Sequence, residues 1–212
     1  MQQGGIQMNQ VVEAFVDWHT WLFTLVAVGN LAIIKYWTAY FPNLVHFIGY
    51  QSFQGKLLSL PPYVLALVCT LVDGWSVSKN KQFGYHVTFF LSLSSCGFVL
   101  MAIFEASDKA VIYLTACIAC CGAFPAFAIL MAWVGSHVTG HTKRAVAIGL
   151  VVGVGQIGGV ILPHILFGES IPALRTAHIV CAVIMAATAA VALLLRIVLS
   201  TRTDGSTAPI LE

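Results

Sequence analysis

Three kinds of side chain in this sequence could do chemistry at their positions: one lysine, one aspartate and a pair of histidines. Lys35 lies within the apolar segment "NLAIIKYWTAYF" and could contact an anion. Asp73 closes another apolar run and could either pair with a cation or carry a proton. His137 and His141 have a helical spacing for metal ligands, but no third ligand follows nearby and Gly140 weakens a helix there. We therefore expect no metal site and no cofactor.

Motifs of catalysis are absent from the sequence. There is no G-x-S-x-G, no H-E-x-x-H and no phosphate-binding loop followed by lysine. Cys117 and Cys120 form a C-x-x-C, but that motif needs a polar, partly exposed helix start to activate a thiol. All the cysteines fall in apolar runs, which favours a packing role and no enzyme activity: Cys69, Cys96, Cys117, Cys120, Cys121 and Cys181.

The composition indicates which solvent surrounds these residues. Hydrophobic residues make up 59% of the 212 residues and charged residues only 8%, whereas a soluble domain carries roughly 25% charged residues. Such a chain is typical of a multi-pass protein of the lipid bilayer. The net charge of +2 comes from dispersed cations, so nucleic acid is not an expected partner.

Apolar length predicts the elements that position the candidate residues. A membrane-spanning helix needs ~20 mostly apolar residues, and barrel strands are about half as long. We expect an all-α bundle of six transmembrane helices within residues 18–199, between a cytoplasmic segment 1–17 and a polar cytoplasmic tail 200–212. The expected spans are 18–41, 57–77, 85–104, 111–134, 145–167 and 174–199. Ser59 before Pro61 and Pro62 is typical of a helix start.

The distribution of cations predicts the orientation. With six spans, both termini lie on one side, and that side holds six cations against three on the other. Because cytoplasmic loops carry the excess of lysine and arginine, both termini are expected in the cytoplasm. The six are Lys79, Lys81, Lys143, Arg144, Arg196 and Arg202. Lys143 and Arg144 would hold the fifth span at anionic headgroups.

Glycines mark the fifth span. Gly149 and Gly153, like Gly155 and Gly159, are four residues apart. Small residues let helix backbones approach in lipid, which favours a helix-packing face. A helix that bends or slides during a transport cycle is the alternative.

Several polar and aromatic residues within the spans have two interpretations each. Lys35 either extends its ammonium group to the membrane surface or contacts an anion in a central cavity. Asn30 lies about 140° away from it around a helix. Tyr36, Trp37 and Tyr40 form an aromatic belt at the membrane surface or stack on a planar substrate. Gln156 needs a partner, either in another helix or in a substrate.

Three motifs, in order along the chain, resemble one family. "VVEAFVDWHTWLFTL" (11–25), "LLSLPPYVLALVCTLVDGW" (57–75) and "GHTKRA" before the glycine-rich span are similar to the seventh, eighth and eleventh helix regions of fungal anion:cation symporters. That family, within the major facilitator superfamily, includes allantoate, nicotinate and pantothenate permeases. One departure is Ser78, which stands where the loop signature G-x-x-x-D-R has its acidic residue.

The resemblance implies the C-terminal six-helix half of a twelve-span carrier. The implied function is secondary transport of a small organic anion, such as a carboxylate or vitamin, with proton coupling and alternating access in the plasma membrane. A second six-helix half would be needed, either a missing N-terminal half or another protomer. The alternative is a truncated or non-transporting membrane protein that packs against a partner chain. The candidate substrate contacts are Asn30, Lys35 and Tyr36, together with Tyr63, Phe124, Phe127 and Gln156, whose helices would border the cavity.

Charged residues near the expected cytoplasmic surface complete the candidate list. Asp73 is expected to pair with Lys79 or Lys81, or else to carry a coupling proton. Lys143 and Arg144 lie in the next cytoplasmic connection. Because Ser78 stands at the acidic position of the loop signature, we do not expect a charge network that holds helix ends in one state of a transport cycle.

Overall fold

The computed structural model describes residues 7–47, 57–104, 109–166 and 174–205. Within these ranges the secondary structure is entirely helical, as the sequence predicted. The helices are α1 (Met8–Val16), α2 (Trp18–Phe47), α4 (Leu60–Asn80), α5 (Phe83–Ile103), α6 (Lys109–His137), α7 (His141–Leu166) and α8 (Leu174–Gly205).

Six of these helices are long and apolar enough to cross a membrane, which confirms the predicted six-helix bundle. The boundaries agree to within a few residues. α4 begins at Leu60 after Ser59, with proline in its first turn, where no helical amide partner is lost. It ends at Asn80, and the left-handed backbone of Lys81 (φ 55°) turns the chain directly into α5.

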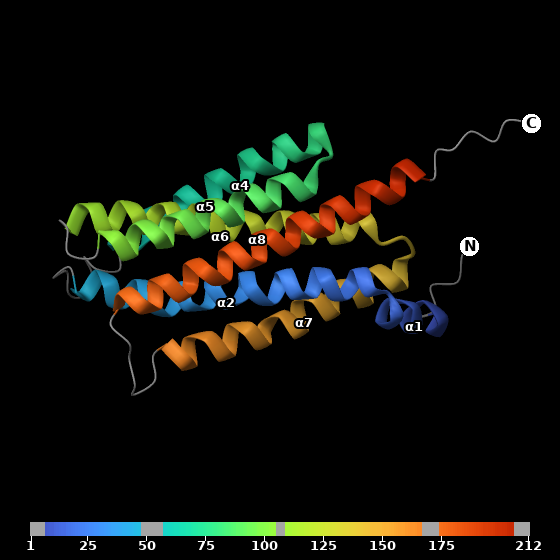
Figure 1. The fold of residues 1–212 in the computed structure, drawn as a ribbon, viewed down its shortest axis with the longest axis horizontal. Helices are drawn as coiled ribbons and strands as arrows, with labels where there is room; N and C mark the ends of the chain where they lie inside the picture. Colours follow the sequence, from blue (N-terminus) through green and yellow to red (C-terminus); the bar gives the residue numbers. More distant parts are fainter. Residues whose placement is uncertain (1–6, 48–56, 105–108, 167–173, 206–212) are drawn as a thin grey trace, which may run out of the picture.

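The long helices run side by side, and α1 lies beside one end of the bundle (Figure 1). We call this end the α1 end; it also holds the α4–α5 turn, the α6–α7 turn and the last residues of α8. Both the first and the last described residues therefore lie at the same end, as an even number of spans requires.

The helix contacts relate the first three spans to the last three. α2 packs on α7 and α6 packs on α4, so the first helix of each triplet contacts the second helix of the other. The third helices, α5 and α8, pack on each other. This exchange is the pattern expected of two inverted three-helix repeats.

α5 and α6 cross closely, with backbone against backbone. A Cβ atom at Gly97 would lie 2.5 Å from the backbone nitrogen of Ala119, and one at Gly122 would overlap the backbone of Phe90 and Ser94. The Ser94 hydroxyl donates a 3.0 Å hydrogen bond to the Ala119 carbonyl oxygen across the same crossing. No G-x-x-x-G spacing marks this contact in the sequence, because Gly97 and Gly122 lie on different helices.

The glycines of α7 divide between two faces. Gly155 lies against Leu31 and Ala27 of α2, and Gly159 lies against the Lys35 side chain. No atom lies within 4 Å of a Cβ placed at Gly149 or Gly153. One G-x-x-x-G pair therefore packs within this chain, whereas the other is on an open surface.

The open surface belongs to the two least buried spans. Only 22% of the apolar windows of α4 and α7 is buried, against 61% for α6 and 56% for α2. α4 and α7 occupy equivalent places in the two triplets, each packed on the first helix of the other. We call the uncovered sides of α4 and α7 the open faces of the bundle.

Candidate functional site

Lys35 is exposed although it lies within a membrane-spanning helix. Its aliphatic stem crosses α7 at Gly159, where a Cβ would come within 2.7 Å of the lysine Cγ. Gly159 is therefore the residue that makes room for this side chain. No carboxylate in the described part of the chain forms an ion pair with Lys35, so its charge is left for a group outside these residues.

Gln156 lies three residues before Gly159, and positions three apart are neighbours on a helix surface. Its side chain is half-buried and makes no hydrogen bond to any residue that the structure describes. Lys35 and Gln156 thus place a cation and an uncommitted amide along the α2–α7 seam. Neither polar group bonds to another side chain within residues 7–47, 57–104, 109–166 and 174–205.

Asn30 is fully buried, and its side chain bonds to the backbone of α6. In the amide orientation that satisfies both partners, its nitrogen donates to the Ala123 carbonyl oxygen at 3.1 Å and its oxygen accepts from the Phe127 N–H at 3.0 Å. These two backbone groups flank Pro125, which lacks an N–H and interrupts the helical bonding of α6. Asn30 therefore ties α2 to α6, while substrate contact by its side chain stays a prediction.

The aromatic residues near the end of α2 lie inside the bundle. Tyr36, Trp37 and Tyr40 are at most 3% exposed, whereas residues of an aromatic belt face the membrane surface. The belt interpretation is therefore wrong for these three residues. The Tyr36 and Tyr40 rings are stacked at 5.4 Å, and Trp37 meets Phe98 of α5 edge to face at 6.1 Å.

Two further candidates contact each other at the same end of the bundle. The Tyr63 ring of α4 lies edge to face with Phe124 of α6 at 5.6 Å and with Phe41 of α2 at 6.3 Å. Tyr63 and Phe124 are only half-buried. Phe127 is also half-buried, and its backbone N–H donates the hydrogen bond to Asn30 described above. Aromatic contacts thus join α2, α4 and α6 at the end opposite to α1.

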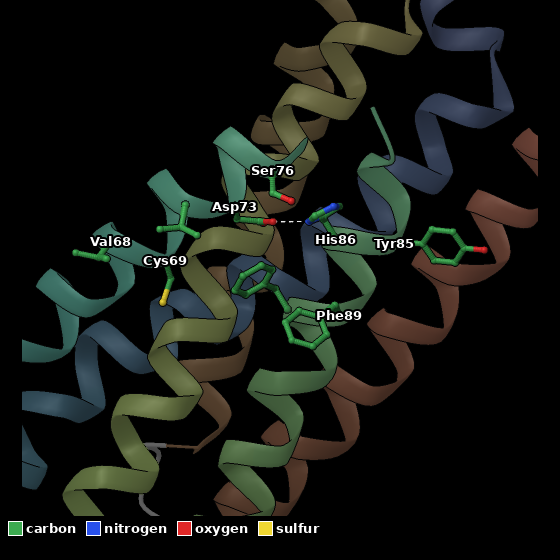
Figure 2. A pocket seen from close by; sticks show the side chains of 9 residues that line it. Val68, Cys69, Asp73, Ser76, Tyr85, His86 and Phe89 are labelled. Atoms are coloured by element: carbon green, nitrogen blue, oxygen red, sulfur yellow. Dashed lines mark hydrogen bonds and ion pairs between the residues drawn. The ribbon is translucent and has the colours of Figure 1, made fainter. Parts of the chain in front are cut away.

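Asp73 pairs with a residue that the sequence analysis did not consider. Its Oδ1 lies 2.5 Å from Nδ1 of His86 on α5, and Figure 2 shows the two side chains meeting across the space between α4 and α5. The expected pairing with Lys79 or Lys81 is wrong: the Lys79 ammonium lies over the Trp75 ring at 3.8 Å, and Lys81 forms no ion pair within the described ranges.

The charges of the α6–α7 turn anchor α1. The Lys143 ammonium lies 3.1 Å from Asp17 Oδ2, and His19 contacts Asp17 Oδ1 at 2.8 Å. Arg144 folds back to donate from Nε to the Val138 carbonyl oxygen at 3.1 Å. Partial burial by itself raises the pKa of Asp17, but hydrogen bonds from His19 and Lys143 outweigh it, so the pKa lies below its ordinary value of 3.8.

This pKa shift predicts a pH-dependent contribution to stability. A carboxyl whose pKa is lowered by folding stabilises the protein above its unfolded pKa, and this contribution is lost as pH falls through the folded pKa. Because the pair is partly exposed, Asp17→Asn should lower the free energy of unfolding by ~1 kcal/mol or less at neutral pH. Thermal unfolding of the purified chain should show this gap closing below about pH 4; a gap that persists in acid would contradict the assignment.

A further histidine that the sequence did not single out is buried in the bundle. His178 of α8 is 2% exposed, and neither ring nitrogen has a hydrogen-bond partner among the described residues. The Tyr40 ring stands edge-on to it at 5.2 Å. The sequence feature that could have pointed to His178 is its place near the start of an apolar run. The feature that could have pointed to His86 is its place across a short helical hairpin from Asp73.

The histidines considered as metal ligands do not form a metal centre with other residues that the structure describes. His137 lies against the rings of His19 and Phe23, at 5.4 and 5.8 Å. No group of three His, Cys, Asp or Glu residues in residues 7–47, 57–104, 109–166 and 174–205 could hold a metal ion.

Six apolar spans around a helical core define an integral, multi-pass membrane protein of the all-α class. The chain is 30% identical over 152 residues to the major facilitator-type transporter hxnP of Emericella nidulans, covering 70% of this chain and 31% of that protein. It is 28% identical over 149 residues to the MFS transporter prlL of Fungal sp. (strain NRRL 50135), covering 68% and 30%. The MFS-type transporter cnsO of Penicillium expansum is 25% identical over 154 residues, covering 71% and 30%.

These relatives are named transporters rather than enzymes, and they support membrane transport and the major facilitator superfamily. The chain spans about a third of the length of the curated relatives it matches. No family model matches the chain. No solved structure matches it significantly.

Proposed function

We propose that this chain is one half of a secondary transporter for a small organic anion, such as a carboxylate or a vitamin, driven by a proton gradient. It works by alternating access with a second six-helix half, in the plasma membrane, with both termini in the cytoplasm. Residues 18–199 form the transporting bundle, residues 1–17 belong to the loop between the halves, and residues 200–212 form a cytoplasmic tail.

The observation that carries the proposal is the exposed lysine of α2. A lysine within the bilayer costs a few kcal/mol on insertion scales, so it usually faces a cavity or a substrate path. Lys35 rests its stem on Gly159 and has no acidic partner in the described part of the chain. A cation placed this way, about one helical turn of α7 from the amide of Gln156, fits a carboxylate.

The open faces of α4 and α7 favour a second half as the partner. Helices associate in lipid where small residues allow close approach, and Gly149 and Gly153 leave such a strip on α7 without a neighbour. α4 exposes large apolar residues over the same share of its length as α7. The second half packs there, and the gap between the halves holds the substrate.

The alternative is a non-transporting membrane protein that only packs against a partner. In such a protein, the polar residues within the spans bond to one another or to a partner chain. Asn30 does so with α6, whereas Lys35 and Gln156 do not do so within the described residues. These two residues are therefore left for a substrate or for a partner chain, and the uptake experiment distinguishes the two.

The test is uptake by the full-length carrier that contains this chain, reconstituted in liposomes with an inward proton gradient. Radiolabelled monocarboxylates, dicarboxylates and carboxylated vitamins serve as probes, and protein-free liposomes are the control. At least one probe should accumulate above equilibrium, and a protonophore should abolish the accumulation. If no probe enters, or if entry stops at equilibrium with the gradient intact, proton-driven anion transport is excluded.

A further inference from the structure

We propose that Asp73 and His86 together form the site that binds the coupling proton. The inference rests on the proposed function, since it names the residues that carry out one part of it. Asp73 lies in α4 and His86 in α5, and their side chains meet at 2.5 Å between Oδ1 and Nδ1. The Asp73 side chain is only 3% exposed, and its second oxygen, Oδ2, is buried without a hydrogen-bond partner among the described residues.

The pair lines a pocket of about 470 Å³ between α4 and α5 (Figure 2). Ser76 and Tyr85 are the other oxygen-bearing side chains around it, and the remaining walls are apolar or carry the Cys69 thiol. His86 is more exposed than Asp73, at 21% against 3% of the side chain. Protons can therefore reach the carboxylate through the imidazole from this pocket.

Other charged and titratable side chains lie around the pair, but none of those described forms an ion pair with the Asp73 carboxylate. On α4, Cys69 lines the same pocket, and Cys121 of α6 lies against that thiol. On α5, the Tyr85 ring lies beneath the guanidinium of Arg196 from α8, at 3.0 Å. Lys79 is held over Trp75. No lysine or arginine within the described ranges forms an ion pair with Asp73.

These surroundings select a proton as the ligand. The Asp73 carboxylate is a buried negative charge without full pairing, which is costly. An added proton neutralises this charge. Because the existing hydrogen bond already holds one proton between Oδ1 and Nδ1, the added proton is held on Oδ2 of Asp73 or on Nε2 of His86. Intramembrane Asp and His residues that face a cavity are typical of such relays.

The position of the pair links its protonation to helix movement. α4 and α5 are joined by the short turn at Lys81 and Gln82 and scarcely contact each other along their lengths, since each packs on α6 instead. The Asp73–His86 hydrogen bond is thus a cross-link between them close to that turn. α4 is also one of the two least buried spans. Gain or loss of a proton at the pair therefore changes how α4 is held against the rest of the bundle.

The direct test is infrared difference spectroscopy of the chain in lipid bilayers, titrated between about pH 5 and pH 8, with the proton itself as the probe. We expect a protonation signal from one carboxyl–imidazole pair that is lost in Asp73→Asn and altered in His86→Gln. The matched controls are Asp17→Asn and His19→Gln, because this pair has the same atoms in contact at 2.8 Å where α1 meets the start of α2. A signal that persists in Asp73→Asn, or that does not respond to His86→Gln, overturns the proposal.

A second measurement uses the full-length carrier with whichever carboxylate the wild type accumulates. Asp73→Asn should reduce accumulation to the equilibrium level while exchange of labelled for unlabelled substrate continues, because exchange needs no net proton movement. Retained accumulation in Asp73→Asn contradicts the inference but leaves the proposed function standing. If the wild type accumulates no carboxylate, the proposed function fails and the infrared result alone decides the proton site.

Discussion

Replacing Gly122 with leucine is expected to prevent the bundle from assembling. A single Cβ at this position already overlaps the Ser94 backbone nitrogen and the Phe90 carbonyl oxygen of α5, and backbone atoms inside two packed helices cannot move aside as a flexible side chain can. Overpacking a tight core typically costs 1–3 kcal/mol or more. Here the two helices must also separate, which breaks the Ser94 hydrogen bond to Ala119. The loss should therefore exceed ~3 kcal/mol.

The measurement is the yield and thermal stability of monodisperse protein in detergent. Gly149→Leu is the matched control, because no atom lies within 4 Å of a Cβ at that position, so the isolated bundle should tolerate it. Equal damage from the two substitutions would show that the α5–α6 crossing is not the tight contact described above. The full-length carrier should respond differently to Gly149→Leu, with lower transport, if the second half packs on that face of α7.

Replacing Lys35 with alanine is expected to reduce anion uptake by the full-length carrier about ten- to a hundredfold. A hydrogen bond to a charged group is worth about 1.5–3 kcal/mol, and each 1.4 kcal/mol is about a factor of ten. Lys35→Arg keeps the charge and should retain more uptake than alanine. Because the lysine stem needs only the space over Gly159, the alanine variant should fold normally, so surface expression should match the wild type.

The control for the lysine is Lys109→Ala, an exposed cation at the first residue of α6. It should leave uptake within about twofold of wild type. Unchanged uptake in Lys35→Ala would mean that the ammonium only extends to the membrane surface, as snorkelling lysines do. The assignment of a carboxylate to this seam would then be lost.

The spans could be predicted from sequence because apolar length is a local property. Twenty apolar residues can satisfy their backbone only as a helix in lipid, and Pro61 and Pro62 after Ser59 marked where α4 begins. The two G-x-x-x-G spacings of α7 also indicated packing, and Gly155 and Gly159 do contact α2. These features need no knowledge of which helices are neighbours.

What the sequence did not reveal depends on those neighbours. A tyrosine that is buried and one that faces headgroups look the same in a membrane span, so a belt is one of two interpretations that the sequence allows for Tyr36 and Tyr40, which lie in the core. Asp73 was paired with the nearest cations in sequence, whereas the hairpin brings His86 closer in space. Gly122 has no glycine four residues away on its own helix, so no G-x-x-x-G spacing indicated the α5–α6 crossing.

The most direct test of the central claim is thiol labelling of Lys35→Cys in a cysteine-free, full-length carrier. If α2 and α7 border a water-filled substrate path between two halves, a hydrophilic, membrane-impermeant thiosulfonate should modify this cysteine. Val183→Cys is the control, since Val183 is exposed on α8 in a span, away from the open faces, and lipid should shield it. Equal resistance of the two cysteines to the reagent would place Lys35 against lipid and contradict the account.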